Sequence, residues 1–192
     1  PFLAATVANN YGLFLLTKSE PDLGSALSEF EKARGTLSRL GSKERYQAIF
    51  NIGTIHALWG DFVKARRFYY DSLLLCPENL EYDRSKFRST HAILGVLAGI
   101  VTIDDAIDVL SNEMEVAARW PDPWLLYHLR SNMSALHQWS NEVLSEPRER
   151  LEALINEYEP TFVDKTRYSI WLKASADTNI TFNLAPSPHW RH

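Results

Sequence analysis

The chain has 192 residues, of which 45% are hydrophobic and 23% charged, with 8 Gly and 9 Pro. This composition is that of an average globular protein, and it excludes collagen-like, low-complexity and wholly disordered chains. The formal net charge of -4 argues against a general nucleic-acid binder, because neutralising phosphates requires a basic face. The single cysteine, Cys76, excludes internal disulfides and cysteine-based metal clusters, so the chain fits a reducing cytosol.

No segment of the sequence predicts a membrane contact. The most apolar stretch, residues 92–103, is too short to span a bilayer, and the first residues lack the basic region of a signal peptide. We therefore expect a cytoplasmic protein. Its first residue, Pro1, is compatible with a removed initiator methionine and with the cut edge of a longer protein.

Apolar residues recur at spacings of three and four along most of the chain, which predicts helix after helix. Eight helices are expected, over about residues 2–18, 22–40, 46–59, 62–75, 84–101, 104–119, 124–143 and 147–158. Local signals mark their ends. Asp22 caps the second helix, Gly41 ends it, Gly60 and Asp61 form the turn before the fourth, and Thr102 or Asp104 caps the sixth.

Small residues repeat at a nearly constant interval of about 40 residues, the length of one helix pair. Gly12, Gly53, Gly95 and Ala135 recur in this way, each within the first helix of a pair. The second helices carry their own small residues at corresponding places, namely Ala26, Ala65 and Ala106. Helices that cross closely need Gly or Ala at the crossing, so we expect a helical solenoid with two helices per unit.

The unit from Tyr46 to Pro77 resembles the tetratricopeptide repeat (TPR) family. The residues that fall where its motif expects them are Gly53, Gly60, Asp61, Phe62, Ala65, Tyr69 and Pro77. The first unit resembles the motif through Gly12, Leu15, Ala26, Phe30 and Ala33, the third through Gly95, Ala106 and Leu110, and the fourth only as a helix pair. The long interval between units resembles the extended repeats of regulatory and signalling proteins.

The resemblance implies that the first helices line a concave groove for a peptide. The groove residues it implies are Thr6, Asn9, Leu13 and Leu16, then Gln47, Phe50, Thr54 and Leu58, then Ser89, Ala92, Val96 and Ile100. One branch of the family clamps acidic chaperone tails with polar and basic groove residues. Asn51 occupies one clamp position. The places where the clamp has other polar or basic residues are occupied here by Asn9, Leu13, Ala92 and Val96, so we expect no such clamp.

Other polar groups favour structural roles. His56 stands where the repeat has an aromatic, which predicts a packed, hydrogen-bonded ring. Asp104, Asp105 and Asp108 begin a helix and meet its positive end, although paired carboxylates also suit acid or metal chemistry. A basic concentration is interpreted as a solvated face that could also steer an acidic partner, and it comprises Lys64, Arg66, Arg67, Arg84, Lys86 and Arg88.

Motifs that carry chemistry are absent from the sequence. No nucleophile elbow, phosphate-binding loop or dinucleotide fingerprint occurs, and Cys76 is interpreted as a small buried hydrophobe. His189 and His192 lie in a Pro-rich end with no helix to orient them. We expect no catalytic residue, metal or cofactor.

Residues 161–192 differ in pattern from the rest. Alternating apolar residues on either side of a turn at 177–179 predict a β-hairpin. It could cap the last helix pair, lead into a further domain, or bind a partner by strand addition.

The sequence thus predicts an all-α, right-handed TPR-like superhelix of about four helix pairs over residues 1–160, with a capping hairpin or tail over 161–192. The expected function is non-enzymatic binding of a protein or peptide. The alternative is a regulatory or sensor domain that controls an enzymatic module elsewhere in a larger signalling, NTPase or nuclease protein.

Overall fold

The computed structural model describes residues 1–18, 20–119, 123–140, 171–173 and 181–183. Seven helices and two short strands lie within those residues. They are α1 (Phe2–Leu16), α2 (Leu23–Arg39), α3 (Arg45–Leu58), α4 (Phe62–Leu75), α5 (Glu81–Leu97), α6 (Ile103–Ala117), α7 (Pro123–Ser140), β1 (Trp171–Lys173) and β2 (Thr181–Asn183).

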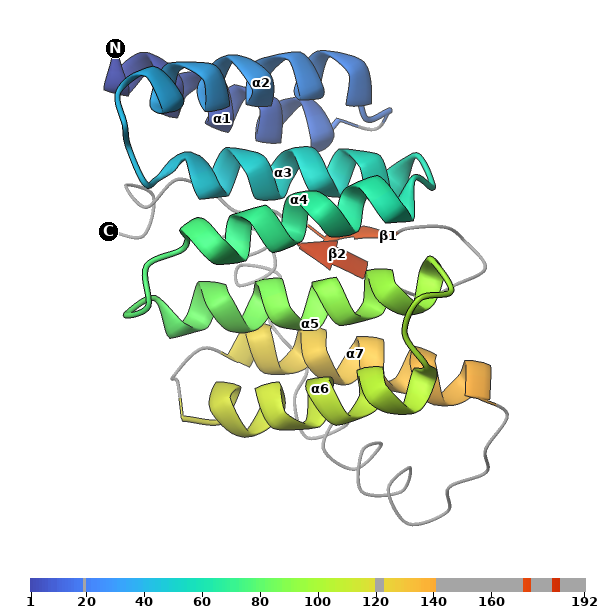
Figure 1. The fold of residues 1–192 in the computed structure, drawn as a ribbon. Coiled ribbons are helices and arrows are strands. Elements are labelled where there is room, and N and C mark those ends of the chain that lie inside the picture. The colour runs from blue at the N-terminus through green and yellow to red at the C-terminus, as the bar shows by residue number, and fades with distance from the viewer. Residues whose placement is uncertain (19, 120–122, 141–170, 174–180, 184–192) are drawn as a thin grey trace.

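Consecutive helices pack against one another from α1 through α7, and α5 also contacts α7. The helices are stacked in series, with α1 and α2 at one end and α6 and α7 at the other (Figure 1). The helical part is therefore an array of packed helix pairs, compatible with an α-solenoid.

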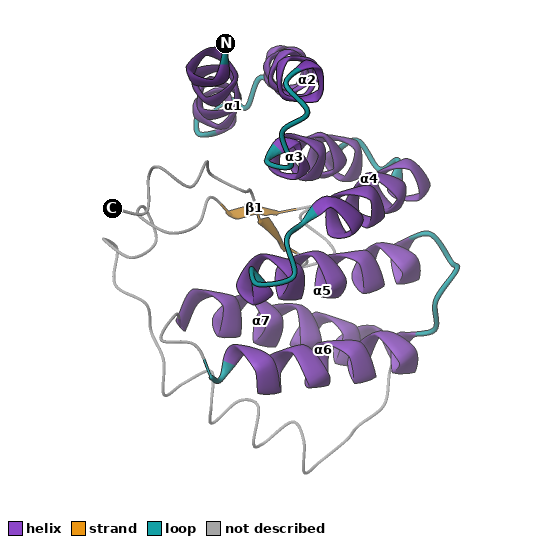
Figure 2. Ribbon diagram, turned by 60° about the vertical axis from the view of Figure 1, so that its left-hand side comes forward, coloured by secondary structure: helices purple, strands orange, loops and turns teal. Residues whose placement is uncertain are grey.

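The strands β1 and β2 pair antiparallel, with Leu172 opposite Phe182. Both lie on the side of the array formed by α3, α5 and α7, and β2 contacts α7 (Figure 2). The residues between the strands lie outside the described part of the chain, so the hairpin stays a prediction. The expected eighth helix over 147–158 also lies outside it.

Local capping sets the helix boundaries as the sequence predicts. The Asp22 carboxylate accepts a hydrogen bond from the Ser25 amide at 2.9 Å, and the Asp61 carboxylate accepts one from the Lys64 amide at 3.2 Å. The Thr102 hydroxyl, and not Asp104, caps α6 by accepting from the Asp105 amide at 3.1 Å. The turns after α2 and α3 contain Gly41 and Gly60, whose positive φ angles of 63° and 79° favour glycine.

The fifth helix differs from its predicted range of 84–101. It begins at Glu81. It ends at Leu97 because Gly99 takes a left-handed conformation with φ 67°. The amides of Ile100 and Val101 both donate to the Gly95 carbonyl, which closes the helix end. The apolar residues 98–101 continued the helical pattern in the sequence, and only the glycine shows where it stops.

Glycines allow the close helix crossings that the repeat predicts. A Cβ atom added to Gly12 would lie 2.6 Å from the Phe30 ring, and one added to Gly53 would lie 2.7 Å from the Tyr69 ring. In the third pair the corresponding Gly95 faces Val101, in the turn between α5 and α6. In this pair the atoms nearest to the added Cβ belong to that turn and not to the second helix.

Aromatic rings in edge-on and tilted contact join the helix pairs. The Phe50 ring of α3 has its centroid 4.5 Å from that of Tyr69 on α4 and 4.5 Å from that of Phe87 on α5. All three rings are fully buried in one apolar cluster that extends to α7. A second cluster joins α1, α2 and α3 and includes Leu13, Leu16 and Phe30.

We predict that Gly53→Ala lowers the free energy of unfolding by about 2 kcal/mol, because the added methyl overlaps the buried Tyr69 ring. Gly35→Ala is the matched control, since Gly35 is exposed within α2 and has no atom within 4 Å of the added Cβ. It should stabilise the protein by about 0.5–1 kcal/mol through helix propensity. Urea unfolding followed by circular dichroism measures both, and equal effects would contradict a close crossing at Gly53.

Candidate functional site

A row of buried polar side chains lies on α1, α3, α5 and α7, and hydrogen bonds within it join α1 to α3 and α3 to α5. We call it the polar row, and it consists of Asn9, Tyr46, Gln47, Asn51, Asp83, Lys86, His128 and Asn132. All of these side chains are buried. Buried polar groups persist only where partners compensate their lost hydration, so each contact indicates a specific arrangement.

The row begins between α1 and α3. The Asn51 side-chain amide donates to the Asn9 side-chain oxygen at 3.0 Å, and the two residues are 42 positions apart in the chain. The pair therefore occupies nearly equivalent repeat positions on successive first helices.

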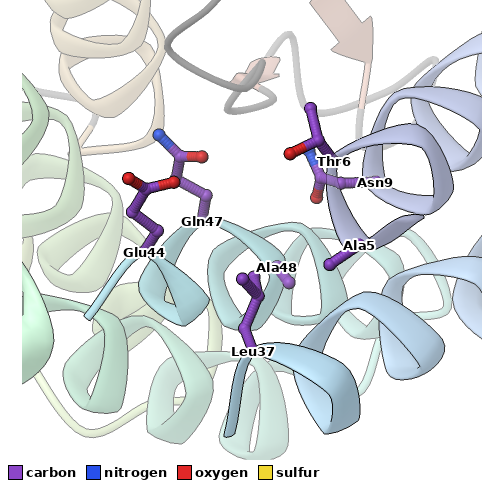
Figure 3. Close-up of a pocket in the computed structure, with 7 residues that line it drawn as sticks. All are labelled: Ala5, Thr6, Asn9, Leu37, Glu44, Gln47 and Ala48. Carbon is purple, nitrogen blue, oxygen red and sulfur yellow. The ribbon is translucent and has the colours of Figure 1, made fainter. Parts of the chain in front are cut away.

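A small pocket lies beside this pair. It is lined by Ala5, Thr6, Asn9, Leu37, Glu44, Gln47 and Ala48. Figure 3 shows Glu44 and Gln47 on one side and Thr6 and Asn9 on the other. Amide, hydroxyl and carboxylate groups thus surround a space floored by Leu37 and two alanines.

The row continues from α3 to α5 through a buried ion pair. The Gln47 amide donates to the Tyr46 hydroxyl at 3.3 Å, and that hydroxyl donates to the Asp83 carboxylate at 3.1 Å. The Lys86 ammonium lies 3.1 Å from the same carboxylate, and both side chains are at most 5% exposed. Burial, and then the Asp83 charge, raise the pKa of Tyr46 far above its usual range, so the phenol stays protonated.

The row ends on α7. The Asn132 side-chain amide lies 3.3 Å from the His128 imidazole Nε2. Burial lowers the pKa of His128 to about 3, and the Lys86 charge adds to this effect. The ring is therefore neutral at pH 7.

The predicted groove residues divide between the polar row and the interior. Asn9 and Gln47 line the pocket, and Thr6 joins them. Phe50 is fully buried between Tyr69 and Phe87, and the Thr54 hydroxyl is hydrogen-bonded to the Tyr69 hydroxyl at 2.6 Å. The side chains of Phe50 and Thr54 therefore face neighbouring helices.

The other predicted groove residues lie mainly in the packed interior. Leu13 and Leu16 belong to the cluster of α1, α2 and α3. Ser89 and Ala92 are buried, Leu58 and Val96 are partly buried, and Ile100 is 55% exposed. An arginine at Phe50 would break the core, so variants of Phe50 do not test a groove.

Asp83, Lys86, His128 and Asn132 were not among the predicted site residues. The spacing of Asp83 and Lys86, three apart on one helix, was a signal for their pairing. No local pattern places His128 and Asn132 on the same row, because their position depends on how α7 packs on α5.

Six basic residues were predicted to form a solvated face, and this prediction is wrong for three of them. Lys86 pairs with Asp83, and Arg88 binds Glu81 at 2.6 Å and Glu113 at 2.9 Å. The Arg84 guanidinium donates to the Cys76 carbonyl at 3.1 Å, at the end of α4. Packing of α5 on α4 and α6 brings Arg84 and Arg88 to acceptors on those helices, whereas Lys86 pairs within α5.

The remaining predicted roles are structural. The His56 ring stacks on Phe68 at 5.4 Å and is 7% exposed, which confirms its packed position. Asp104 and Asp105 lie in the first turn of α6, as expected for carboxylates at a helix start. Cys76 is buried, and burial together with Asp83 raises the pKa of its thiol to about 12, so the thiolate is not populated at neutral pH.

Among the described residues, no group of three or more histidine, cysteine and acidic side chains has the arrangement of a metal site. The described helices also include none that is both long and apolar enough to cross a bilayer. Comparison with protein-family models, curated proteins and solved structures found no match. Function is therefore inferred from the residues themselves.

We predict that Lys86→Met lowers the free energy of unfolding by about 3 kcal/mol, because the Asp83 carboxylate loses its cation in a buried place. Adding Asp83→Asn should recover a large part of this loss, since no uncompensated charge is then buried. A double-mutant cycle by urea unfolding measures the coupling, and additive losses would contradict the buried pair.

We predict a pH dependence of stability from His128. Its pKa is lower in the folded than in the unfolded protein, so its contribution is complete above about pH 6.5 and falls as the pH drops toward about 3. Between pH 7.5 and 5.0 this residue alone should cost about 2 kcal/mol. Urea unfolding at both pH values should show a smaller difference for His128→Gln than for wild type, and an equal difference would contradict a buried neutral ring.

Proposed function

We propose that this chain is a non-enzymatic protein-binding module of the TPR type, a right-handed array of about four helix pairs. Its first helices would hold an extended segment of a partner protein beside the polar row, over the pocket that Thr6, Glu44 and Gln47 line. The observation that carries the proposal is the presence of buried, hydrogen-bonded polar side chains on α1, α3, α5 and α7, the helices that line the groove in the family this sequence resembles.

The chemistry of the row suits an extended peptide. Each side-chain amide of Asn9, Gln47, Asn51 and Asn132 carries both donors and an acceptor, the two functions that a peptide backbone presents. Such groups recognise backbone irrespective of sequence, while pockets between them select side chains. The small pocket between Thr6 and Gln47 presents hydroxyl, amide and carboxylate groups to such a segment.

The strands provide further support for this side of the array. β1 and β2 lie on the side of α3, α5 and α7, and β2 contacts α7. Extended backbone is thus compatible with this surface. We also propose that residues 161–192 form the predicted hairpin and cover the last helices, as terminal repeats require a cap.

The proposal is tested by Thr6→Val, with Asn112→Ala as control. Thr6 is half-buried on α1 and lines the pocket, whereas Asn112 is exposed on α6. Proteins captured from cells of the source organism by the wild-type chain are identified by mass spectrometry, and circular dichroism verifies that both variants are folded.

The expected result is a specific partner whose capture falls about ten-fold with Thr6→Val, since the hydrogen bond between the Thr6 hydroxyl and the peptide is lost and the peptide group is left unpaired. Capture by Asn112→Ala should equal that of wild type. Equal capture by all three proteins would place the binding surface elsewhere, and turnover of a substrate by the chain would contradict a binding module.

A further inference from the structure

The helix α4 exposes apolar side chains in the middle of the array. Val63, Tyr70 and Leu74 are 63%, 49% and 65% exposed, and Arg67 is exposed between them. Their spacing of four, three and four places all four residues on one side of the helix. We call these residues the α4 stripe. Other helix pairs lie on either side of α4 in Figure 1, so the stripe belongs to an internal helix.

The equivalent positions on α2 and α6 carry glycine, serine or an acidic residue. When Ala26, Ala65 and Ala106 are aligned, the positions that correspond to the stripe are Gly24, Ser28, Glu31 and Gly35 on α2, and Asp104, Asp108, Ser111 and Glu115 on α6. All of them except Glu31 are exposed. An apolar outer side is therefore particular to α4, and a contiguous exposed apolar surface of this kind indicates a binding site.

Unpaired cations accompany the stripe. Lys64, Arg66 and Arg67 give α4 three positive charges against one negative charge, that of Asp71. None of the three cations forms an ion pair with a residue that the structure describes. By comparison, Lys32 and an arginine near it on α2 are both paired with acids three positions before them. The surface of α4 thus has an excess of positive charge that its own neighbours do not compensate.

The guanidinium of Arg66 lies at the edge of the stripe, against α5. A Cβ atom added to Gly95 of α5 would lie 3.3 Å from Arg66 Nε, so the arginine packs where α5 has no side chain. That Nε atom is buried and has no hydrogen-bond partner in the described part of the chain. Next to it, the Tyr70 ring has its centroid 5.8 Å from that of His91. A cation that has lost water without gaining an acceptor is stabilised when a carboxylate binds it.

The order of these residues along α4 is that of one helix of a coiled coil. Apolar residues at alternating spacings of three and four form the seam of paired helices, and the positions beside the seam select the partner by charge. Val63, Arg67, Tyr70 and Leu74 have the spacing of a seam, and Lys64 is one of the residues beside it. A complementary helix has apolar residues at the same spacing and acidic residues beside them.

We propose that the α4 stripe is a docking site for an acidic amphipathic α-helix of a partner protein. The apolar residues of this helix would pack on Val63, Tyr70 and Leu74, and its aspartates and glutamates would bind the three unpaired cations. The stripe lies on a second helix and is distinct from the polar row, so this inference does not depend on the function proposed above.

The probe is a fluorescein-labelled peptide of three heptads, with isoleucine and leucine along its seam and glutamate at both positions beside the seam. Repulsion between glutamates keeps the peptide from pairing with itself. The control peptide has lysine in place of each of these glutamates. Binding of both peptides to the full chain is measured by fluorescence anisotropy at about 0.05 and 0.5 M NaCl.

Three variants separate charge from apolar contact. Arg67→Glu reverses the charge at the centre of the stripe, and Arg39→Glu is the matched control, since Arg39 is an exposed arginine of another second helix, α2. Leu74→Gln removes apolar area from the stripe without changing its charge. All three side chains are exposed, so the variants should keep the wild-type circular dichroism spectrum.

The expected result is saturable binding of the glutamate peptide by wild type that weakens about five-fold or more at the higher salt concentration, because exposed ion pairs are screened. At low salt, Arg67→Glu should weaken binding about ten-fold or more, and Arg39→Glu should change it less than about two-fold. Leu74→Gln should weaken binding about five-fold at both salt concentrations. The lysine peptide should bind about ten-fold more weakly than the glutamate peptide.

Several outcomes would overturn the proposal. Absence of saturable binding, equal binding by wild type and Arg67→Glu, or equal binding of the two peptides would each show that the stripe does not select an acidic helix. A wild-type dimer in sedimentation velocity that Arg67→Glu converts to monomer would assign the stripe to the acidic α6 of a second copy. Displacement of the peptide by a single-stranded oligonucleotide would assign it to nucleic acid.

Discussion

The close approach of the two helices in each pair is the constraint on which the array depends. A glycine of the first helix faces an aromatic ring of the second, Gly12 to Phe30 and Gly53 to Tyr69, and there is no space for a methyl group. The same Tyr69 ring packs on Phe50, which packs on Phe87 of the following helix. In these two pairs the glycine limits the position of the ring, and Tyr69 contacts the next pair through Phe50 and Phe87. In the third pair Gly95 faces Val101 of the turn between α5 and α6.

Burying the polar row within such an apolar stack costs desolvation free energy. The ion pair of Lys86 and Asp83 has little access to water, and its attraction must offset the desolvation of both charges. Apolar residues of similar size would often stabilise a fold as well or better, so the retention of this pair has no simple explanation in stability. The Asp83 carboxylate also accepts a hydrogen bond from the Tyr46 hydroxyl at 3.1 Å, so the charged pair links α3 to α5 in the interior.

The sequence by itself determined the number and limits of most helices from α1 to α7, since capping by Asp22, Asp61 and Thr102 depends only on neighbours in the chain. It also determined the crossing glycines, because their interval is the interval of the repeat. The tertiary structure alone decided which side of a largely apolar helix meets its neighbours. Phe50 was expected in a groove and lies in the core, because spacing cannot distinguish two apolar sides of one helix. His128 and Lys86 come together only when α7 packs on α5, a contact between distant parts of the chain that no local pattern encodes.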